Sequence, residues 1–302
     1  MSAHSMRDIK NRIDGVSQTR QITGAMYLLS SSRLKKLTGN MEYTLRYMNR
    51  LRKTMADVLH VTKGAGIQNR FLDKDSKGTA LFMPVMGDKG LCGSYNMDVV
   101  RLTQEKLAKY DDAMVYCFGE LGKDLLTAKG VRVDRVLPGS SMHPDVTLSR
   151  ELAAALIDMY VTDKVNEVYI IYTPFVKGAR EPVSFRLLPL LRHDFQDLGR
   201  DKAPEEMLYE PSAEEVFEHM VPLYCSSMIY DFLVQSSASE NAARMEAMKA
   251  ASDAADEMIG SLTAELNAVR QLSITQEITE IAAATLQREV REKPAQTSAE
   301  NT

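Results

Sequence analysis

The sequence predicts an α/β protein in which long N- and C-terminal helices form an antiparallel coiled coil, joined to a Rossmann-like open α/β domain. Apolar residues recur in steps of three and four at both ends, the two ends carry opposite net charge, and strand-like and helix-like segments alternate between them. The predicted parts are a helix at residues 7–63, an α/β domain at 64–204, a helix at 205–291 and a disordered tail at 292–302.

The two terminal segments are too long for an ordinary globular core. At about 1.5 Å per residue they would span roughly 85 and 120 Å as unbroken helices, so their apolar stripes have to pair with each other. The stripe positions are Ile9, Ile13, Val16, Ile22, Met26, Leu29, Leu37, Met41, Leu45, Met48, Leu51, Met55 and Val58 in the first segment, and Ala238, Ala242, Met245, Met248, Ala255, Ile259, Leu262, Leu266 and Val269 in the last.

Charge supports the pairing. Residues 7–63 carry 12 Lys/Arg against 4 Asp/Glu, a net charge of +8, whereas residues 205–291 carry 5 against 16, a net charge of −11. Each exposed ion pair contributes only about 0–1 kcal/mol. Burial of the apolar seam therefore has to supply most of the stability, and the charges favour one partner and one direction.

Composition excludes several classes of protein. The 302 residues have a net charge of −4, which gives no overall attraction to polyanions. Cys92, Cys117 and Cys225 are an odd number without metal-type spacing, which indicates reduced thiols. No apolar run reaches about 18 residues, so we expect no transmembrane helix. The polar start lacks a targeting pattern.

The middle of the chain alternates between predicted strands and helices, a pattern typical of an open, mainly parallel sheet, here with an antiparallel edge. The predicted strands are 79–86, 114–118, 131–136, 167–173 and 182–189, and the predicted helices are 97–109, 120–128 and 148–162. Pro222 predicts a break or kink near the start of the last helix.

A glycine-containing turn between a strand and a helix is the first candidate for chemistry. Gly87, Gly90 and Gly93 could place a phosphate at a helix N-terminus, but their spacing matches neither common phosphate-binding motif. A tight structural turn is the favoured interpretation. Cys92 in the same turn could be a nucleophile, yet no histidine stands in a recognisable pairing with it, which favours a buried thiol.

Two charged groups on the helices have simple explanations. Glu277 and Glu280 lie three residues apart, as a general acid and base could, but a solvated helix face is the usual arrangement. The basic cluster of Arg33, Lys35 and Lys36 lacks aromatic residues for stacking on bases, which favours an exposed coiled-coil flank over nucleic-acid binding.

Separate stretches, in the same order along the chain, closely resemble the gamma subunit of F-type ATP synthase. They are Arg12–Met26 (RIDGVSQTRQITGAM), Gly87–Asn96 (GDKGLCGSYN), Ala238–Asp253 (ASENAARMEAMKAASD) and Arg270–Ile281 (RQLSITQEITEI). The sequence departs from that family at Gly24, where a lysine is common, at Ala284 and Thr285, and in about 15 residues beyond the usual end.

The resemblance implies a rotor shaft that couples ion-driven ring rotation to ATP synthesis or hydrolysis. Such a subunit has no catalytic residues, cofactor or metal of its own, and it neither binds nucleic acid nor inserts into the membrane. Its implied partners are the alpha and beta subunits of the catalytic hexamer, the epsilon subunit and the membrane ring of c subunits. Its implied location is the cytoplasmic face of a bacterial cell membrane, as a peripheral part of the complex.

The resemblance also implies contact residues. Those expected at the beta-subunit levers and loops, at the foot near epsilon and the ring, and at the shaft tip are Thr19, Gln21, Ile22, Met26, Tyr209, Glu210, Arg270, Gln271, Thr275, Gln276, Glu277 and Glu280. Two other functions stay open from the residues alone. They are a non-rotary adaptor that docks partner helices on its coiled coil, and a nucleotide-dependent enzyme built on the glycine turn.

Overall fold

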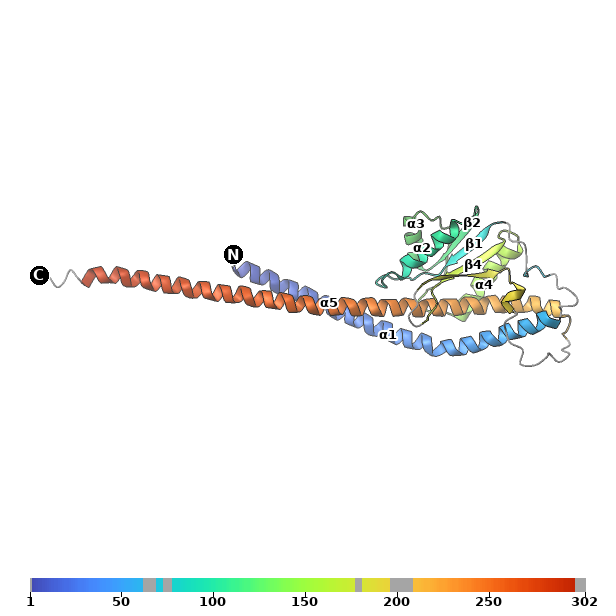
Figure 1. Cartoon of the computed structure of the whole chain (residues 1–302), viewed down its shortest axis with the longest axis horizontal. Coiled ribbons are helices and arrows are strands. Elements are labelled where there is room, and N and C mark those ends of the chain that lie inside the picture. The colour runs from blue at the N-terminus through green and yellow to red at the C-terminus, as the bar shows by residue number, and fades with distance from the viewer. Residues whose placement is uncertain (1, 62–68, 73–77, 177–180, 196–208, 297–302) are drawn as a thin grey trace. The chain divides into compact units, whose positions relative to one another are not determined.

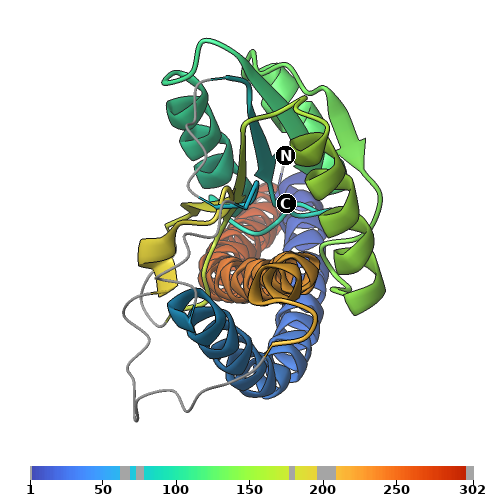
Figure 2. The ribbon, with the colours of Figure 1, turned by 90° about the vertical axis from the view of Figure 1, so that its right-hand side faces the viewer.

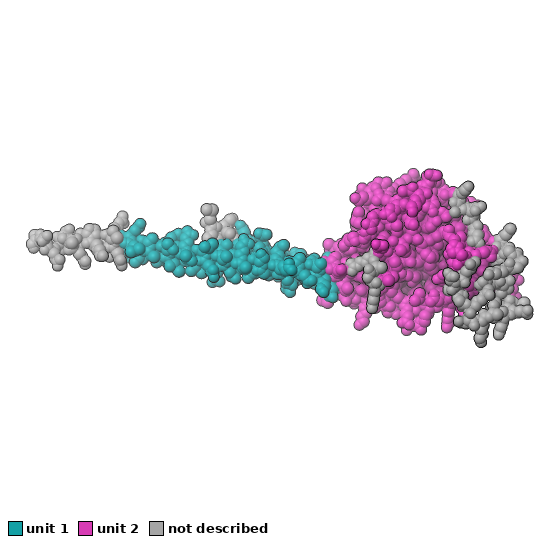
Figure 3. All heavy atoms as spheres, in the orientation of Figure 1, with its two compact units in different colours: residues 1–27, 248–302 teal, residues 28–247 magenta. Residues whose placement is uncertain are grey.

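The computed structural model describes residues 2–61, 69–72, 78–176, 181–195 and 209–296. The chain divides into two compact units (Figure 3). The first, hereafter the helical unit, comprises residues 1–27 and 248–302, and the second, hereafter the α/β unit, comprises residues 28–247. The expected boundary between residues 204 and 205 lies outside the described residues.

Helices α1 (Ser2–Val61) and α5 (Ala213–Gln296) each contribute to both units. The helix α5 is not interrupted at Pro222, so the predicted break is absent, whereas the alternative of a kink there stays a prediction. Phe217, Val221 and Cys225 are fully buried on both sides of the exposed proline and hold the helix together. It also continues five residues past the expected end at 291, to Gln296. Residues 297–302 of the expected tail lie outside the described residues.

The α/β unit contains a five-stranded sheet in the order β3-β2-β1-β4-β5. Figure 1 labels its three central strands, β2, β1 and β4. The strands β1 to β4 are parallel, and β5 pairs antiparallel with β4, as the alternation of segments predicts. The strands are β1 (Ala80–Pro84), β2 (Ala113–Phe118), β3 (Arg135–Leu137), β4 (Glu167–Tyr172) and β5 (Val183–Leu188), and the connecting helices are α2 (Tyr95–Leu107), α3 (Glu120–Ala128) and α4 (Val146–Val161).

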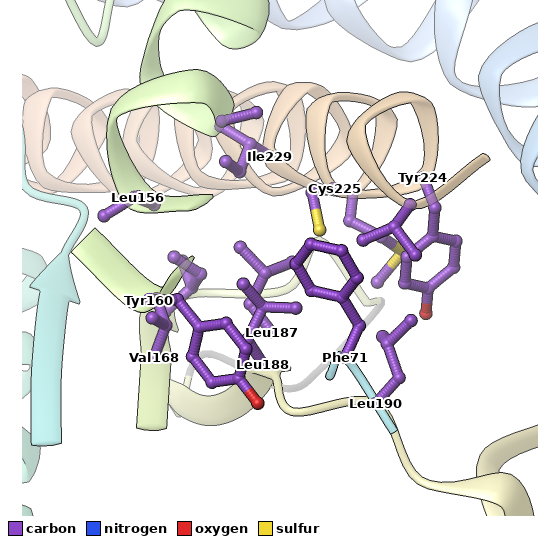
Figure 4. Close-up of a cluster of buried hydrophobic side chains, with 14 of the residues drawn as sticks. Phe71, Leu156, Tyr160, Val168, Leu187, Leu188, Leu190, Tyr224, Cys225 and Ile229 are labelled. Atoms are coloured by element: carbon purple, nitrogen blue, oxygen red, sulfur yellow. The ribbon is translucent and has the colours of Figure 1, made fainter. Parts of the chain in front are cut away.

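Both faces of this sheet are covered, which explains why every residue of β1 is buried. One face packs on α2 and α3, through Phe82, Val99 and Leu126 among others. The other face packs on α4, α5 and the second half of α1 in one apolar cluster, part of which Figure 4 shows. Helix α5 lies between the sheet and α1 in this unit (Figure 2), so it is the central element of the core.

The helical unit is a two-helix assembly whose buried positions follow a seven-residue repeat. Met248, Ala255 and Leu262 of α5 are each at most 7% exposed. Arg20 of α1 pairs with Asp256 of α5 at 2.6 Å at the rim of this seam. Seven-residue spacing keeps the same side of a helix facing its partner, as in a coiled coil.

The predicted stripe of α1 is wrong at three positions. Ile22, Leu29 and Leu45 are 61%, 61% and 56% exposed, whereas Thr23 and Ser30 are buried. Ile9, Val16, Thr23, Ser30 and Leu37 stand seven residues apart, so the repeat passes through the two small polar residues. Hydrophobicity alone therefore selects neighbouring residues that face away from the seam.

Candidate functional site

The carboxyl ends of the parallel strands converge on one segment of α5. Doubly wound sheets bind ligands at this edge, where the strand order reverses, which here is at β1. In this protein, side chains of α5 lie at that edge. Four residues of α5, hereafter the polar joint, contact the loops that follow the strands: Ser236, Ser239, Glu240 and Arg244.

Arg244 is the main contact to the loop after β1. Its Nε donates to the carbonyl oxygen of Gly90 at 3.2 Å, and its Nη2 donates to the carbonyl oxygen of Lys89 at 3.0 Å and to Oε1 of Glu240 at 2.6 Å. The side chains of Arg244 and Glu240 are only 6% and 1% exposed. The pair is therefore a buried ion pair, and Nε and Nη2 of the guanidinium also donate to backbone carbonyls.

Glu240 extends the joint to the loop after β3. Its Oε2 accepts from the hydroxyl of Ser141 at 3.1 Å, and that hydroxyl also accepts from the amide of Asp88 at 3.1 Å. Asp88 accepts in turn from the Ser140 hydroxyl at 2.5 Å and from the amide of Glu120, at the start of α3, at 3.2 Å. Burial raises the pKa of the Glu240 carboxyl, and Arg244 opposes that shift.

Ser236 and Ser239 connect α5 to the loop after β4. The Ser236 hydroxyl accepts from the amide of Thr173 at 3.4 Å, and the Ser239 hydroxyl donates to the carbonyl oxygen of Pro174 at 3.0 Å. Ser236, Glu240 and Arg244 stand four residues apart and share one face of the helix, and Ser239 borders this face. One helical face thus ties together loops from three strands.

The glycine turn presents the wrong groups for a phosphate. The carbonyls of Lys89 and Gly90 point to a cation, and the amide of Gly87 donates to Oδ1 of Asn96 at 2.8 Å. A Cβ added at Gly87 would lie 2.9 Å from the Glu240 carboxyl carbon. A carboxylate in this position repels an anion, which supports the structural interpretation of the turn over the enzymatic one.

Cys92 packs inside the same turn. Its thiol is 2% exposed and receives a hydrogen bond from the Asn96 amide at 3.6 Å. Burial, and secondarily the Glu240 carboxylate, raises the pKa of the Cys92 thiol. Both effects disfavour the thiolate, so this environment does not activate a nucleophile. Among the described residues no group of His, Cys, Asp and Glu could hold a metal ion.

The expected contact residues of α1 lie on its surface in the helical unit. Thr19, Gln21 and Ile22 are exposed, and Met26 is half-buried. The Thr19 hydroxyl donates to the carbonyl oxygen of Gly15 at 3.0 Å, within its own helix. Ile22, at 61% exposure, is an apolar side chain of this unit that faces solvent.

The expected contact residues near the end of α5 are all exposed. They are Arg270, Gln271, Thr275, Gln276, Glu277 and Glu280. Gln276 donates to Glu280 at 2.9 Å, so this carboxylate is engaged along its own helix. The same stretch also exposes large apolar side chains, between 46% and 70% of their surface, namely Leu272, Ile274, Ile278, Ile281 and Leu286.

Tyr209 and Glu210, the expected foot residues, precede α5 in the α/β unit. Tyr209 is half-buried against the main apolar cluster, whereas Glu210 is exposed. Burial raises the pKa of the Tyr209 hydroxyl, and the nearby Asp57 carboxylate adds to the shift. None of the helices in the described part of the chain is long and apolar enough to cross a membrane.

Comparison with known proteins adds to this geometry. The family model described as ATP synthase matches residues 5–285. The ATP synthase gamma chain of Caldanaerobacter subterraneus is 39% identical over 290 residues, which are 91% of this chain and 97% of the relative. This chain belongs to the ATP synthase gamma-chain family. The sequence resemblance is thereby confirmed over nearly the whole chain.

Other members of the gamma-chain family show the same extent of similarity. The ATP synthase gamma chain of Ruminiclostridium cellulolyticum is 36% identical, and the sodium-ion-specific gamma chain of Acetobacterium woodii is 32% identical. Each match covers 92% of this chain and 97% of the relative.

Solved structures confirm the fold of this gamma-chain family member. A chain of the mitochondrial ATP synthase of Euglena gracilis aligns with a TM-score of 0.67 at 16% identity, over 96% of this chain and 97% of that one. A central-stalk chain from Tetrahymena thermophila aligns with a TM-score of 0.54 at 23% identity, over 76% and 99%. The mixed α/β architecture with its long terminal helices is thus a known one.

The polar joint is the feature that sequence reasoning missed. Periodicity assigned Ala238 and Ala242 to a seam, and Glu240 and Arg244 went unremarked inside one of the resembling motifs. A signal was present, because an acidic and a basic residue four apart interrupt a run of alanines and serines. The same spacing is common on solvated helix faces, so only the tertiary structure distinguishes the two cases.

Proposed function

We propose that this chain is the central-stalk subunit of an F-type ATP synthase and couples ion-driven rotation of a membrane ring to ATP synthesis and hydrolysis in an alpha/beta hexamer. Membership of the gamma-chain family supports this proposal. So do the aligned structures, which belong to the F1 part, the central stalk and the c-ring of other ATP synthases.

The exposed end of α5 is the observation that carries the proposal. Ile274, Ile278 and Ile281 stand four and three residues apart and are 46%, 62% and 67% exposed. Spacing of this kind places them on one face of the helix, and no described residue of this chain covers them. A contiguous apolar stripe in water indicates a protein partner, and we propose that the alpha/beta hexamer is this partner.

The α/β unit supports a non-catalytic role. Its fold is one that often binds nucleotides at the carboxyl edge of the sheet, but here the Glu240–Arg244 pair contacts the loops at that edge. Buried carboxylate at this position opposes a phosphate. We therefore assign the chemistry to the partner subunits and the mechanical coupling to this chain, which weakens the alternative of a nucleotide-dependent enzyme.

The proposed parts are a shaft helix at 7–63, the α/β domain at 64–204 and a second shaft helix that starts within 205–213. This second helix continues to Gln296, so the expected tail at 292–302 begins within it. The proposed contacts with the beta subunits are Thr19, Gln21, Ile22, Met26, Arg270, Gln271, Thr275, Gln276, Glu277 and Glu280. Tyr209 and Glu210 are the proposed contacts near the epsilon subunit and the c-ring, at the cytoplasmic face of a bacterial cell membrane.

Coupling requires that the chain interact differently with each catalytic subunit. The two shaft helices present different side chains on different sides. Ile22 is an exposed apolar residue, for example, whereas Arg20 and Asp256 form an ion pair. Each angular position would then favour a different conformation in each neighbouring subunit. Differential binding of this kind is what allows rotation to shift the populations of catalytic states.

Co-expression with the remaining ATP synthase subunits of the source organism tests the proposal. A tagged chain should purify with the alpha/beta hexamer and epsilon, and vesicles containing the complete complex should build a membrane potential on addition of ATP. A tagged chain that purifies without the hexamer, bound instead to unrelated helical proteins, would support the adaptor alternative and overturn the proposal.

A further inference from the structure

We propose that the polar joint, formed by Ser236, Ser239, Glu240 and Arg244 of α5, is the coupling through which the α/β domain and the helical shaft exchange torque. The inference rests on the proposed rotary function and adds to it. At these four residues a rotation of the domain would turn the helix with it.

The joint lies where α5 leaves the α/β unit. Arg244 is three residues before Ala247, the last residue of that unit on this helix. From Met248 onward, α5 belongs to the helical unit. Both α1 and α5 run from the α/β unit into the helical unit, and Arg244 lies just before that boundary on α5. Torque that α5 receives from the sheet can therefore be transferred at the polar joint.

Apolar packing alone is a poor torque coupling. Phe217, Ile229 and Phe232 of α5 are buried in the main cluster, but apolar contact is non-directional and tolerates repacking. Hydrogen bonds and charge-assisted pairs depend steeply on angle and distance. A rotation of α5 by one residue, about 100° around its axis, would break every contact of the polar joint at once.

The polar joint also connects α5 to several strands of the sheet. Its contacts reach the loops after β1, β3 and β4, and through Asp88 they reach the first residue of α3. A load on α5 is thus distributed over several strands of the sheet. Three strands held in one register resist twisting better than one loop does.

Stability is a weak explanation for this pair. Desolvation of a buried ion pair offsets most of its attraction, and replacing such a pair by uncharged residues of similar volume is often neutral or stabilising. Glu240 and Arg244 are 1% and 6% exposed and fall under this rule. Directional register is the property that uncharged residues would not supply.

The test uses the complete membrane complex in vesicles. The double variant Glu240→Gln with Arg244→Met removes both charges and leaves no unpaired buried ion. ATP hydrolysis and ATP-driven membrane potential are measured together, with a potential-sensitive dye that responds to protons and sodium ions alike. The matched control is Glu105→Gln with Lys109→Met, which removes one charge of each sign from the exposed surface of the α/β domain.

We expect the double variant to assemble and to hydrolyse ATP within twofold of the wild type, while the initial pumping rate per ATP hydrolysed falls at least threefold. The control should change neither quantity. Equal pumping per ATP in the double variant and the control would overturn the inference. If the double variant does not assemble, Arg244→Lys decides. This variant keeps the positive charge opposite Glu240 but loses the guanidinium group that donates to the carbonyls of Lys89 and Gly90. About a twofold loss of pumping per ATP would support the joint, and unchanged pumping per ATP would refute it.

A wild-type complex that does not assemble or pump would contradict the proposed function before any variant is compared. A wild-type complex that pumps, with variants that pump equally well, would contradict only the joint. The two failures are therefore distinguishable.

Discussion

Replacing Leu262 by aspartate should open the seam of the helical unit. The Leu262 side chain is 5% exposed, so its removal forfeits about 2–3 kcal/mol of apolar burial. An unpaired polar group at the same place costs about 1–3 kcal/mol more. The sum, about 3–6 kcal/mol, raises the population of the separated helices by roughly 10²- to 10⁴-fold.

Met258→Asp is the matched control, because Met258 lies four residues earlier on the same helix and is 50% exposed. Both variants place an aspartate in a helix interior, so the loss of helix propensity is similar in the two and cancels. Native-state hydrogen exchange of the amides at residues 7–27 reports the opening of the pair directly. Equal exchange rates in the two variants would show that Leu262 does not lie on the seam.

Three further outcomes are expected. Gly119→Ala should lower the free energy of unfolding, measured by chemical denaturation, by more than about 2 kcal/mol. The reason is that Gly119 has a φ of +106° and an added Cβ would lie 2.2 Å from the carbonyl oxygen of Met86. The control is Gly130→Ala, which has a φ of +79° and open space around it and should lower the same free energy by only about 1 kcal/mol. Titration of the purified chain with ATP and Mg²⁺ should show no dissociation constant below about 10 μM, equivalent to roughly −7 kcal/mol, and tighter binding would revive the enzymatic alternative. Deleting residues 292–302, which contain Pro294 and no apolar anchor, should leave the coupled ATPase rate within about twofold, or roughly 0.5 kcal/mol; a severalfold acceleration would instead reveal a brake at the tip.

Local sequence patterns were sufficient to predict most of the helices and strands of the α/β unit. The prediction of a helix at 120–128 agrees with α3, and the strand expected at 167–173 agrees with β4 to within one residue. These segments are short, apolar and bounded by turn residues, so their local preference and their final environment coincide. The order of the strands was not predicted, because pairing depends on crossovers between distant segments.

The terminal helices show where periodicity is insufficient. Their existence and length followed from the repeat of apolar residues, yet Ile22 and Leu29 are exposed while Thr23 and Ser30 are buried. Ile22 is adjacent to Thr23, and Leu29 is adjacent to Ser30, so the seam could pass through either member of each pair. The small side chains of Thr23 and Ser30 permit a closer approach of the partner helix, and periodicity of apolar residues does not detect this.

The sequence by itself therefore determined the α/β class, the two long helices, their opposite charges and the family. Those properties depend on residues near one another in the chain, or on motifs that are recognisable without a structure. Only the tertiary structure decided what fills the carboxyl edge of the sheet. Glu240 and Arg244 meet Ser141 and Gly90 across 99 and 154 residues, respectively. Contacts at such separation leave no periodic trace, and it is the packing of α5 on the sheet that creates them.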